Sequence, residues 1–259
     1  MQTHISLEMQ QDVAYLTLAC DEPGKPATLD LLVLDELDEA LDRIETGAKR
    51  LCAVIVRSDS EKYFCVGANV NALETLDAES IVPWIQKGHA VFNRLQALPL
   101  PVLARVEGYA LGGGLELAMA CDLILAAQRA RFGQPEANLG FVAGWGGTFR
   151  LPRRIGVPRA KELLFTGQII DAARAHEIGL VSFCGDSAAL DEYLGSILEN
   201  IRRCSPIAVS QMKKLVNDNP DISLRESCYE ETVASCICMS SGDTKARIKA
   251  FLDSRRGKK

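Results

Sequence analysis

Two glutamates, Glu116 and Glu136, have the side-chain type and the surroundings that proton-transfer chemistry requires. Each is set among apolar or glycine neighbours, and Glu116 directly follows the GGGL run at 112–115. A glycine run lets a ligand approach the backbone closely, and a helix that starts there points unpaired N–H groups at the ligand. Carboxyl groups that move protons, together with backbone donors that stabilise an oxyanion, are the components of chemistry next to a carbonyl group.

Each of these features also has a structural explanation. Because no lysine or arginine lies within one helical turn of Glu116, its carboxyl group is either at an aqueous cleft or buried with a raised pKa. Glu136 follows a proline, a context typical of the first turn of a helix, where acids stabilise the helix dipole. The glycines can form a simple packing turn, and they lack the G-x-G-x-x-G spacing of a dinucleotide site. The pair of acids is therefore more informative than either member.

The composition argues against several classes of function. With 259 residues, 47% hydrophobic and 24% charged, the chain is typical of a globular protein. Its net charge of −5 argues against nucleic acid as a partner, since phosphate binding needs a concentrated basic face. The longest apolar stretch, 109–127, contains Glu116 and Asp122, and such charges are costly in a membrane span. We therefore interpret this stretch as buried protein and expect no membrane association.

The cysteine and histidine content predicts neither disulfides nor a metal site. The nine cysteines are an odd number, and most lie in apolar runs, where a thiol behaves as a small hydrophobic side chain. With three histidines in the chain, we expect no zinc site. Residues 1–8 have neither the basic start nor the apolar core of a secretory signal. A reducing compartment fits the free thiols, so we expect a cytoplasmic protein, or one in an organelle matrix if a targeting segment has been removed.

Short apolar strands alternate with helices along the first part of the chain, which predicts an α/β fold. The predicted strands are 13–18, 53–56, 102–106 and 123–126. A helix is expected at 83–98, ending where Pro99 disfavours helix in the preceding residue. The helix that carries Glu116 follows the third of these strands.

The pattern changes beyond Pro158, where most segments have helical periodicity. One strand is predicted among them, at 180–183. We place a boundary near residue 200, so that residues 1–200 form the core with the site and residues 201–259 form a helical C-terminal region.

The segment around Glu116 resembles the signature of the crotonase (enoyl-CoA hydratase/isomerase) superfamily. The similarity begins with VEGYALGGGLELAMACD at 106–122 and continues through FGQPE at 132–136 and GGTFRLP at 146–152. Shorter matches extend it over nearly the whole chain. The resemblance implies a spiral of repeated β-β-α turns and a helical C-terminal region that forms trimers, commonly paired into a homohexamer as a dimer of trimers.

The resemblance also implies an acyl-CoA ligand and a role for each site residue. The thioester oxygen would be held in an oxyanion hole by the backbone N–H groups of Ala68 and Gly113. Glu116 would act as the base toward the water that attacks the β-carbon, and Glu136 would supply a proton to the α-carbon. The backbone N–H of Gly144 would help to hold the water.

Contacts with CoA and with the acyl chain follow from the same resemblance, with three departures from the family pattern. Lys25, Val66 and Ala68 are expected to contact CoA, although the sequence around Lys25 differs from that usual in the family. Trp145 stands where the family usually has alanine and is expected to reshape the acyl pocket. Asn69 stands where relatives often have aspartate, which changes the local charge.

Glutamates at both positions are the pattern of the hydratases within this superfamily, whereas many isomerases, hydrolases and decarboxylases keep only one or move it. We therefore expect an enoyl-CoA hydratase that adds water across a 2-trans-enoyl-CoA to give a 3-hydroxyacyl-CoA, in fatty-acid β-oxidation or related acyl-CoA degradation. The alternatives are an enoyl-CoA isomerase or another crotonase-type enzyme and, from another class, a non-catalytic acyl-CoA- or RNA-binding protein. No metal, flavin or nicotinamide is expected, and coenzyme A enters only as the substrate thioester.

Overall fold

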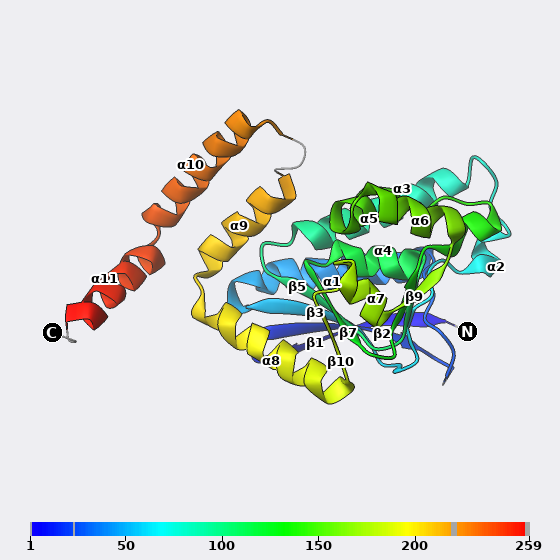
Figure 1. Ribbon diagram of the computed structural model, residues 1–259, viewed down its shortest axis with the longest axis horizontal. Helices are drawn as coiled ribbons and strands as arrows, with labels where there is room; N and C mark the ends of the chain where they lie inside the picture. Colours follow the sequence, from blue (N-terminus) through cyan, green and yellow to red (C-terminus); the bar gives the residue numbers. More distant parts are fainter. Residues whose placement is uncertain (1, 23, 219–221, 257–259) are drawn as a thin grey trace.

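The computed structural model describes residues 2–22, 24–218 and 222–256, and Figure 1 shows their arrangement. The strands are β1 (Thr3–Gln10), β2 (Val13–Cys20), β3 (Ala53–Ser58), β4 (Tyr63–Cys65), β5 (Val102–Val106), β6 (Tyr109–Leu111), β7 (Leu123–Ala127), β8 (Arg131–Gly133), β9 (Ile169–Asp171) and β10 (Phe183–Gly185). The α-helices are α1 (Leu31–Gly47), α2 (Val70–Leu73), α3 (Ile81–Ala97), α4 (Gly113–Ala120), α5 (Gly147–Ile155), α6 (Val157–Thr166), α7 (Ala172–Glu177), α8 (Ser187–Arg203), α9 (Pro206–Asp218), α10 (Leu224–Ser240) and α11 (Gly242–Arg256). Short 3-10 helices are η1 (Ala48–Arg50) and η2 (Pro135–Leu139).

The larger of two sheets forms the centre of the core. In the described residues it has six strands in the order β1-β2-β3-β5-β7-β10, antiparallel between β1 and β2 and parallel elsewhere. Its inner strands are continuous apolar runs, such as residues 53–56, because both faces of a parallel sheet are covered. Helices α1, α3 and α4 pack over one face, and α8 packs over the other with Leu190, Leu194 and Leu198.

The smaller sheet brings three loop regions to one edge. Its order is β4-β6-β8-β9, with β4, β6 and β8 parallel and β9 antiparallel to β8. Ligands of parallel sheets bind beyond the carboxyl ends of the strands, which meet at one edge. The segments that follow β4, β6 and β8 are 66–68, 112–113 and 134–136, and these are the segments predicted to carry the site.

Three successive turns of the chain repeat the same path. In each turn the first strand joins the larger sheet, the second joins the smaller sheet, and a helix follows. The three sets are β3, β4 and α3, then β5, β6 and α4, then β7, β8 and α5. The predicted α/β spiral of β-β-α turns is confirmed.

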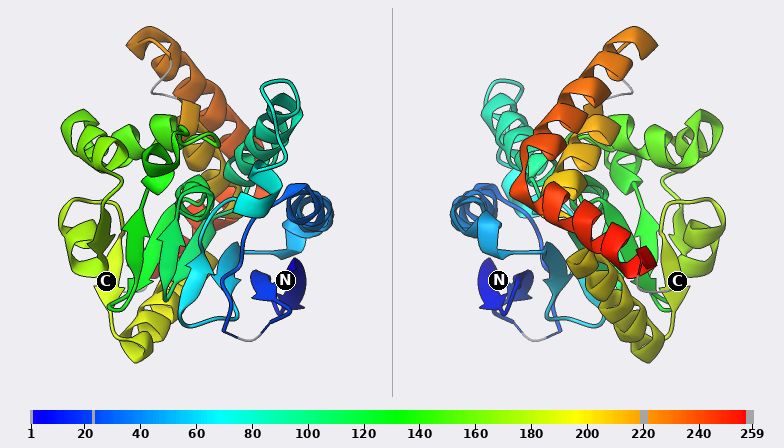
Figure 2. Two further views of the ribbon diagram at one scale, coloured as in Figure 1. Left: turned by 90° about the vertical axis from the view of Figure 1, so that its right-hand side faces the viewer. Right: turned by 90° about the vertical axis from the view of Figure 1, so that its left-hand side faces the viewer.

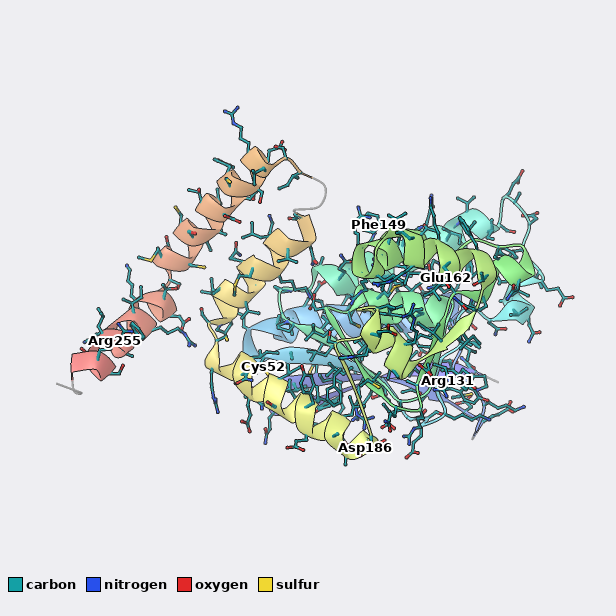
Figure 3. All side chains as sticks on the ribbon, viewed as in Figure 1. Cys52, Arg131, Phe149, Glu162, Asp186 and Arg255 are labelled. Carbon is teal, nitrogen blue, oxygen red and sulfur yellow. The ribbon has the colours of Figure 1, made fainter. Side chains whose placement is uncertain are left out.

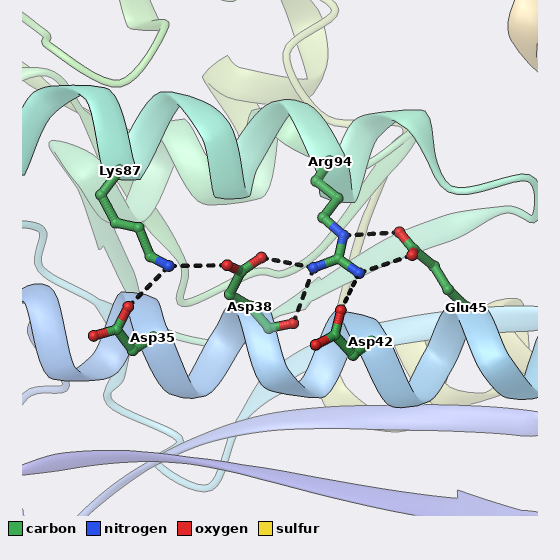
Figure 4. Close-up of polar contacts among 6 residues, drawn as sticks. All are labelled: Asp35, Asp38, Asp42, Glu45, Lys87 and Arg94. Carbon is green, nitrogen blue, oxygen red and sulfur yellow. Dashed lines mark hydrogen bonds and ion pairs between the residues drawn. The ribbon is translucent and has the colours of Figure 1, made fainter.

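Helices α1 and α3 lie side by side and are joined by a network of charges (Figure 4). Asp30 begins α1, because its Oδ1 accepts a hydrogen bond from the Val33 N–H over 3.0 Å. Acidic side chains then recur at helical spacing along the face toward α3, at Asp35, Asp38, Asp42 and Glu45. The Lys87 Nζ lies 2.8 Å from the Asp35 carboxylate and 2.9 Å from that of Asp38. The Arg94 guanidinium lies 2.7 Å from Asp38, 2.5 Å from Asp42 and 2.7 Å from Glu45. The network helps to fix the position of α3.

The last three helices leave the core. Helix α9 is joined to it by Lys213, whose Nζ contacts the Asp122 carboxylate over 2.8 Å and the Leu100 carbonyl over 2.9 Å. Helices α10 and α11, which we call the C-terminal arm, extend away from both sheets (Figures 1 and 2). The arm's side chains stand clear of the core in Figure 3. The predicted boundary at residue 200 lies inside α8, and the change of packing follows at α9.

Six strands differ from those predicted from the residue pattern. The strand predicted at 180–183 lies instead at 183–185, because Leu180 and Val181 close the end of α7. Their N–H groups both donate to the Ala175 carbonyl, over 2.8 and 3.3 Å. Strands β1, β4, β6, β8 and β9 were not predicted from the residue pattern. Strands β1 and β9 are edge strands whose side chains are mostly exposed or half-buried, so they lack an apolar run, and β4, β6 and β8 have only three residues each.

The cysteines, the possible metal ligands and the apolar helices bear on the remaining expectations. All nine cysteines are free thiols. Within the described part of the chain, no group of three or more His, Cys, Asp or Glu side chains is arranged to hold a metal ion. None of the helices in the same residues is both long and apolar enough to cross a membrane.

Candidate active site

A chamber of about 90 Å³ lies under α3, at the edge of the smaller sheet where the carboxyl ends of its parallel strands meet. Seven of the eight predicted site residues line it, namely Val66, Ala68, Gly113, Glu116, Glu136, Gly144 and Trp145. Larger hollows of about 670 and 730 Å³ lie beside α8 and α9, but neither glutamate reaches them. The chamber is therefore where the predicted chemistry can take place.

Glu116 lies in the first turn of α4, and its side chain is only 2% exposed. Its Oε1 accepts hydrogen bonds from the backbone N–H groups of Trp145, over 2.8 Å, and of Gly147, over 2.7 Å. Gly147 is the first residue of α5, so the carboxyl group also faces the positive end of a helix dipole. One oxygen is thus fixed by the backbone, and the carboxyl group is held in place for chemistry at the chamber.

Burial, followed by the negative charge of Glu136, raises the pKa of Glu116 to about 7. The N–H groups of Gly147 and Trp145 and the positive charge of Arg150 act in the opposite direction. Of the two locations that the sequence left open, the structure shows the buried one with a raised pKa. Such a carboxyl group exchanges its proton near neutral pH, which suits a general base.

Glu136 lies in η2, directly after Pro135, and burial raises the pKa of its carboxyl group as well. Gly112 has a φ of 53°, and a Cβ there would lie 3.1 Å from Glu136 Oε1, so glycine leaves room for this carboxyl group. The buried Gln134 side chain faces the same group. With its amide nitrogen turned toward Glu136, Gln134 donates to the two oxygens over 2.8 and 3.0 Å.

Ala68 and Gly113 bring two backbone N–H groups to the chamber wall. Gly113 is the first residue of α4, so its N–H has no carbonyl partner within the helix. Ala68 pairs with Leu29 in a parallel β-bridge. The Leu29 N–H donates to the Gly67 carbonyl and the Asn69 N–H donates to the Leu29 carbonyl, so the Ala68 N–H takes no part in the bridge. Gly67 has a φ of 93°, and a Cβ there would come within 2.9 Å of the Gly113 nitrogen. A side chain at Gly67 would therefore crowd the predicted oxyanion hole.

Gly144 and Trp145 belong to the loop that precedes α5. The Trp145 ring packs against Trp84 and Phe92 of α3, with ring centroids 4.4 and 5.6 Å apart. A Cβ at Gly144 would lie 2.7 Å from Cδ1 of Ile85, so the loop also touches α3 there. Helix α3 thus covers this side of the chamber. The water-holding role of the Gly144 N–H stays a prediction.

Sequence reasoning missed Arg150, a cation that is only 5% exposed and braces the same loop. Its guanidinium donates to the Trp145 carbonyl over 2.8 Å, to Asn93 Oδ1 over 2.7 Å and to Gln96 Oε1 over 2.8 Å. Burial lowers the pKa of Arg150, and the charge of Glu116 raises it. The sequence signal for the burial of Arg150 is helical periodicity. Arg150 lies three residues after the buried Gly147, and so on the same face of α5.

Lys25 is the predicted site residue that lies outside the chamber. It is exposed, two residues before Ala27, whose carbonyl accepts the Val66 N–H over 3.0 Å. Lys25 is therefore close in sequence to the chamber wall, and its contact with CoA stays a prediction. Asn69 caps α2 by accepting the Asn71 N–H over 3.1 Å, as an aspartate would.

The chain is similar to known proteins over nearly its whole length. The model of the enoyl-CoA hydratase/isomerase family matches residues 8–258. The chain is 36% identical over 256 residues to the short-chain-enoyl-CoA hydratase of Clostridium acetobutylicum, covering 98% of this chain and 96% of that protein. It is 34% identical over 218 residues to the mitochondrial methylglutaconyl-CoA hydratase of Rattus norvegicus, covering 78% and 67%. A solved structure of enoyl-CoA hydratase from Bacillus anthracis superposes with a TM-score of 0.89 at 33% identity, over 97% of this chain and 96% of that one.

Proposed function

Because the chain belongs to the enoyl-CoA hydratase/isomerase family and is an enoyl-CoA hydratase by its full-length relatives, we propose that Glu116 and Glu136 add water across the double bond of a 2-trans-enoyl-CoA. The observation that carries this proposal is the convergence on one chamber of two carboxyl groups with raised pKa and two backbone N–H groups. Hydration needs each of these components.

The proposed reaction begins with the thioester oxygen accepting hydrogen bonds from the N–H groups of Ala68 and Gly113. Glu116 takes a proton from water as the water oxygen bonds to the β-carbon, and the π electrons move toward the thioester oxygen. Each backbone donor is worth about 3 kcal/mol as negative charge develops there. Glu136 then gives a proton to the α-carbon, and the product is a 3-hydroxyacyl-CoA.

Two further assignments belong to the same proposal. Val66 and Ala68 at the chamber wall contact the CoA part of the substrate, and the exposed Lys25 meets its phosphates. The reaction draws on no cofactor beyond that CoA, since the proton transfers and the oxyanion stabilisation all come from residues of this chain. The enzyme serves fatty-acid or related acyl-CoA degradation in the cytoplasm, where its nine free thiols stay reduced.

The pH dependence of crotonyl-CoA hydration tests the assigned protonation states. The charge of Glu136 helps to raise the pKa of Glu116 to about 7, so this value belongs to the loss of the second proton of the coupled pair. The proposed reaction needs one proton on the pair, so kcat/KM is expected to fall above about pH 7, and to fall also in acid, where both carboxyl groups are protonated. The profile is measured by loss of ultraviolet absorbance. A rate that stays constant from acid to alkaline pH would contradict the assignment.

We also propose that the C-terminal arm joins subunits into a homotrimer or a dimer of trimers. Large apolar side chains of α10 and α11 are exposed, among them Tyr229, Val233, Ile237, Ile248 and Phe251. Exposed apolar surface on this scale is typical of an interaction site. Light scattering after size-exclusion chromatography is expected to give three or six times the chain mass of 28.2 kDa. A monomer at micromolar concentration would contradict this proposal.

A further inference from the structure

Helix α4 carries two of the components that the proposed reaction needs, and both lie in its first turn. Gly113 is its first residue and supplies an oxyanion N–H, and Glu116 supplies the base. All eight residues of α4 are buried, and Glu116 alone among them is charged. Apolar contacts are non-directional, so they do not by themselves fix the position of a helix along its axis. Hydrogen bonds at its two ends can do so, because they are directional.

Helix α5 forms hydrogen bonds with both ends of α4. At the N-terminal end, the Gly147 N–H donates to Glu116 Oε1 over 2.7 Å. At the C-terminal end, the last carbonyl groups of an α-helix have no partner within the helix. There the Arg154 Nη2 donates to the Met119 carbonyl over 3.0 Å and to the Cys121 carbonyl. The position of α4 along its axis is therefore set from α5 at both ends.

The spacing along α5 explains how one helix reaches both ends of another. Gly147 and Arg154 are seven residues apart, which is about two helical turns, so they lie on the same face of α5. Arg150 lies between them and donates to the Trp145 carbonyl instead. The guanidinium of Arg154 also brings a positive charge to the C-terminal end of α4, where the helix dipole favours a cation. Arg154 thus stabilises the end of α4 that lies away from the chamber.

The C-terminal end of α4 borders a hollow that water can enter. This hollow, of about 670 Å³ beside α8 and α9, is lined by Met119, Cys121 and Arg154. Water there can satisfy the carbonyl groups if the guanidinium is removed. Asp122, which follows α4, is held separately by Lys213 of α9 over 2.8 Å. The hydrogen bonds of Arg154 can therefore be removed while the fold is retained.

We propose that Arg154 is a positioning residue for hydration. It holds the C-terminal end of α4, so that the Gly113 N–H and the Glu116 carboxyl group keep their places at the chamber. A misplacement of about 1 Å caused far from the reacting atoms can lower a rate by about 100-fold. The inference rests on the roles proposed for Gly113 and Glu116, and Arg154 itself does not line the chamber.

The variant Arg154→Met keeps a long unbranched side chain and removes the donors. We expect kcat for crotonyl-CoA hydration to fall at least about tenfold, with KM little changed, because the loss concerns alignment in the transition state. Arg154→Lys keeps the positive charge but is too short to reach both carbonyl groups, so its kcat should be intermediate. Arg159→Met, at an exposed position of α6, is the matched control and should keep the full kcat.

The infrared stretching frequency of the thioester carbonyl in bound butyryl-CoA tests the same alignment without turnover. Hydrogen bonds from the N–H groups of Ala68 and Gly113 polarise this carbonyl and lower its frequency. We expect a smaller lowering in Arg154→Met than in the unaltered protein or in Arg159→Met. A merely structural role would lower the urea midpoint of unfolding and leave both this frequency and the kcat of the folded enzyme unchanged.

The combined results separate this inference from the proposed function. An unchanged kcat and an unchanged carbonyl frequency in folded Arg154→Met would overturn the positioning role. If Arg154→Met does not fold, Arg154→Lys decides, and values equal to those of the unaltered protein in that variant would overturn the role as well. If the unaltered protein lowers the carbonyl frequency in a way that depends on Arg154 but does not hydrate crotonyl-CoA, the positioning role stands and the proposed function is refuted.

Discussion

Replacing either Glu116 or Glu136 by glutamine is expected to lower kcat for crotonyl-CoA hydration by about 100-fold to 10,000-fold, the range of a lost general acid or base. Glutamine keeps the size of the side chain and one oxygen. At Glu116 that oxygen can still accept the N–H groups of Trp145 and Gly147, so the loop stays in place. The effect should therefore fall on kcat, with KM little changed. Steady-state kinetics from the ultraviolet absorbance of the enoyl thioester measures both.

The matched control is Glu162→Gln, which removes an exposed glutamate of α6 (Figure 3) that does not line the chamber. Its rate should equal that of the unaltered protein. Undiminished hydration in Glu116→Gln and in Glu136→Gln would show that neither acid moves a proton. If both variants lose hydration but a 3-enoyl-CoA is isomerised by the unaltered protein faster than crotonyl-CoA is hydrated, the site serves isomerisation instead.

Replacing Arg150 by methionine is expected to lower the free energy of unfolding by about 3 kcal/mol. The change leaves three buried acceptors without their donor, namely the Trp145 carbonyl, Asn93 Oδ1 and Gln96 Oε1. It also removes the link between α5 and α3. Urea denaturation followed by circular dichroism measures the loss. Arg159→Met, at an exposed position of α6, is the matched control and should change stability by less than about 0.5 kcal/mol.

The same variant should also move the pH profile of hydration. The positive charge of Arg150 lowers the pKa of Glu116, so its removal lets that pKa rise. The alkaline fall of kcat/KM is then expected at higher pH than in the unaltered protein, in folded enzyme assayed well below its unfolding midpoint. A purely structural role would reduce stability and leave the pH of this fall unchanged.

The spiral and most of the site could be predicted because their signals are local in sequence. The runs at 53–56 and 102–106 are apolar enough to be strands of a covered sheet, and the glycines at 112–114 mark a close approach of the backbone. The sequence could not show that Glu116 accepts hydrogen bonds from a loop about 30 residues away. Such a contact depends on how the turns of the spiral stack.

Arg150 and Trp145 show why other features escaped prediction. Arg150 belongs to a run with two more arginines, which is typical of an exposed helix end, yet it is buried because three acceptors surround it. Trp145 was expected to alter the acyl pocket, and it does line the chamber. Its fixed position depends on Gly88 in another helix, and no sequence pattern connects the two residues.

The charges that join α1 to α3 have a consequence for the conditions under which the enzyme works. Helix α3 covers Trp145. Lys87 and Arg94 hold α3 to four acids of α1 through partly exposed ion pairs. Screening shortens the reach of such charges from about 10 Å at 0.1 M salt to about 3 Å at 1 M. The packing of Trp145 against Gly88 and Gly113, and the sheet beneath, involve no ion pairs, so salt leaves them intact. High ionic strength should therefore loosen the attachment of α3 to α1 well before it unfolds the core.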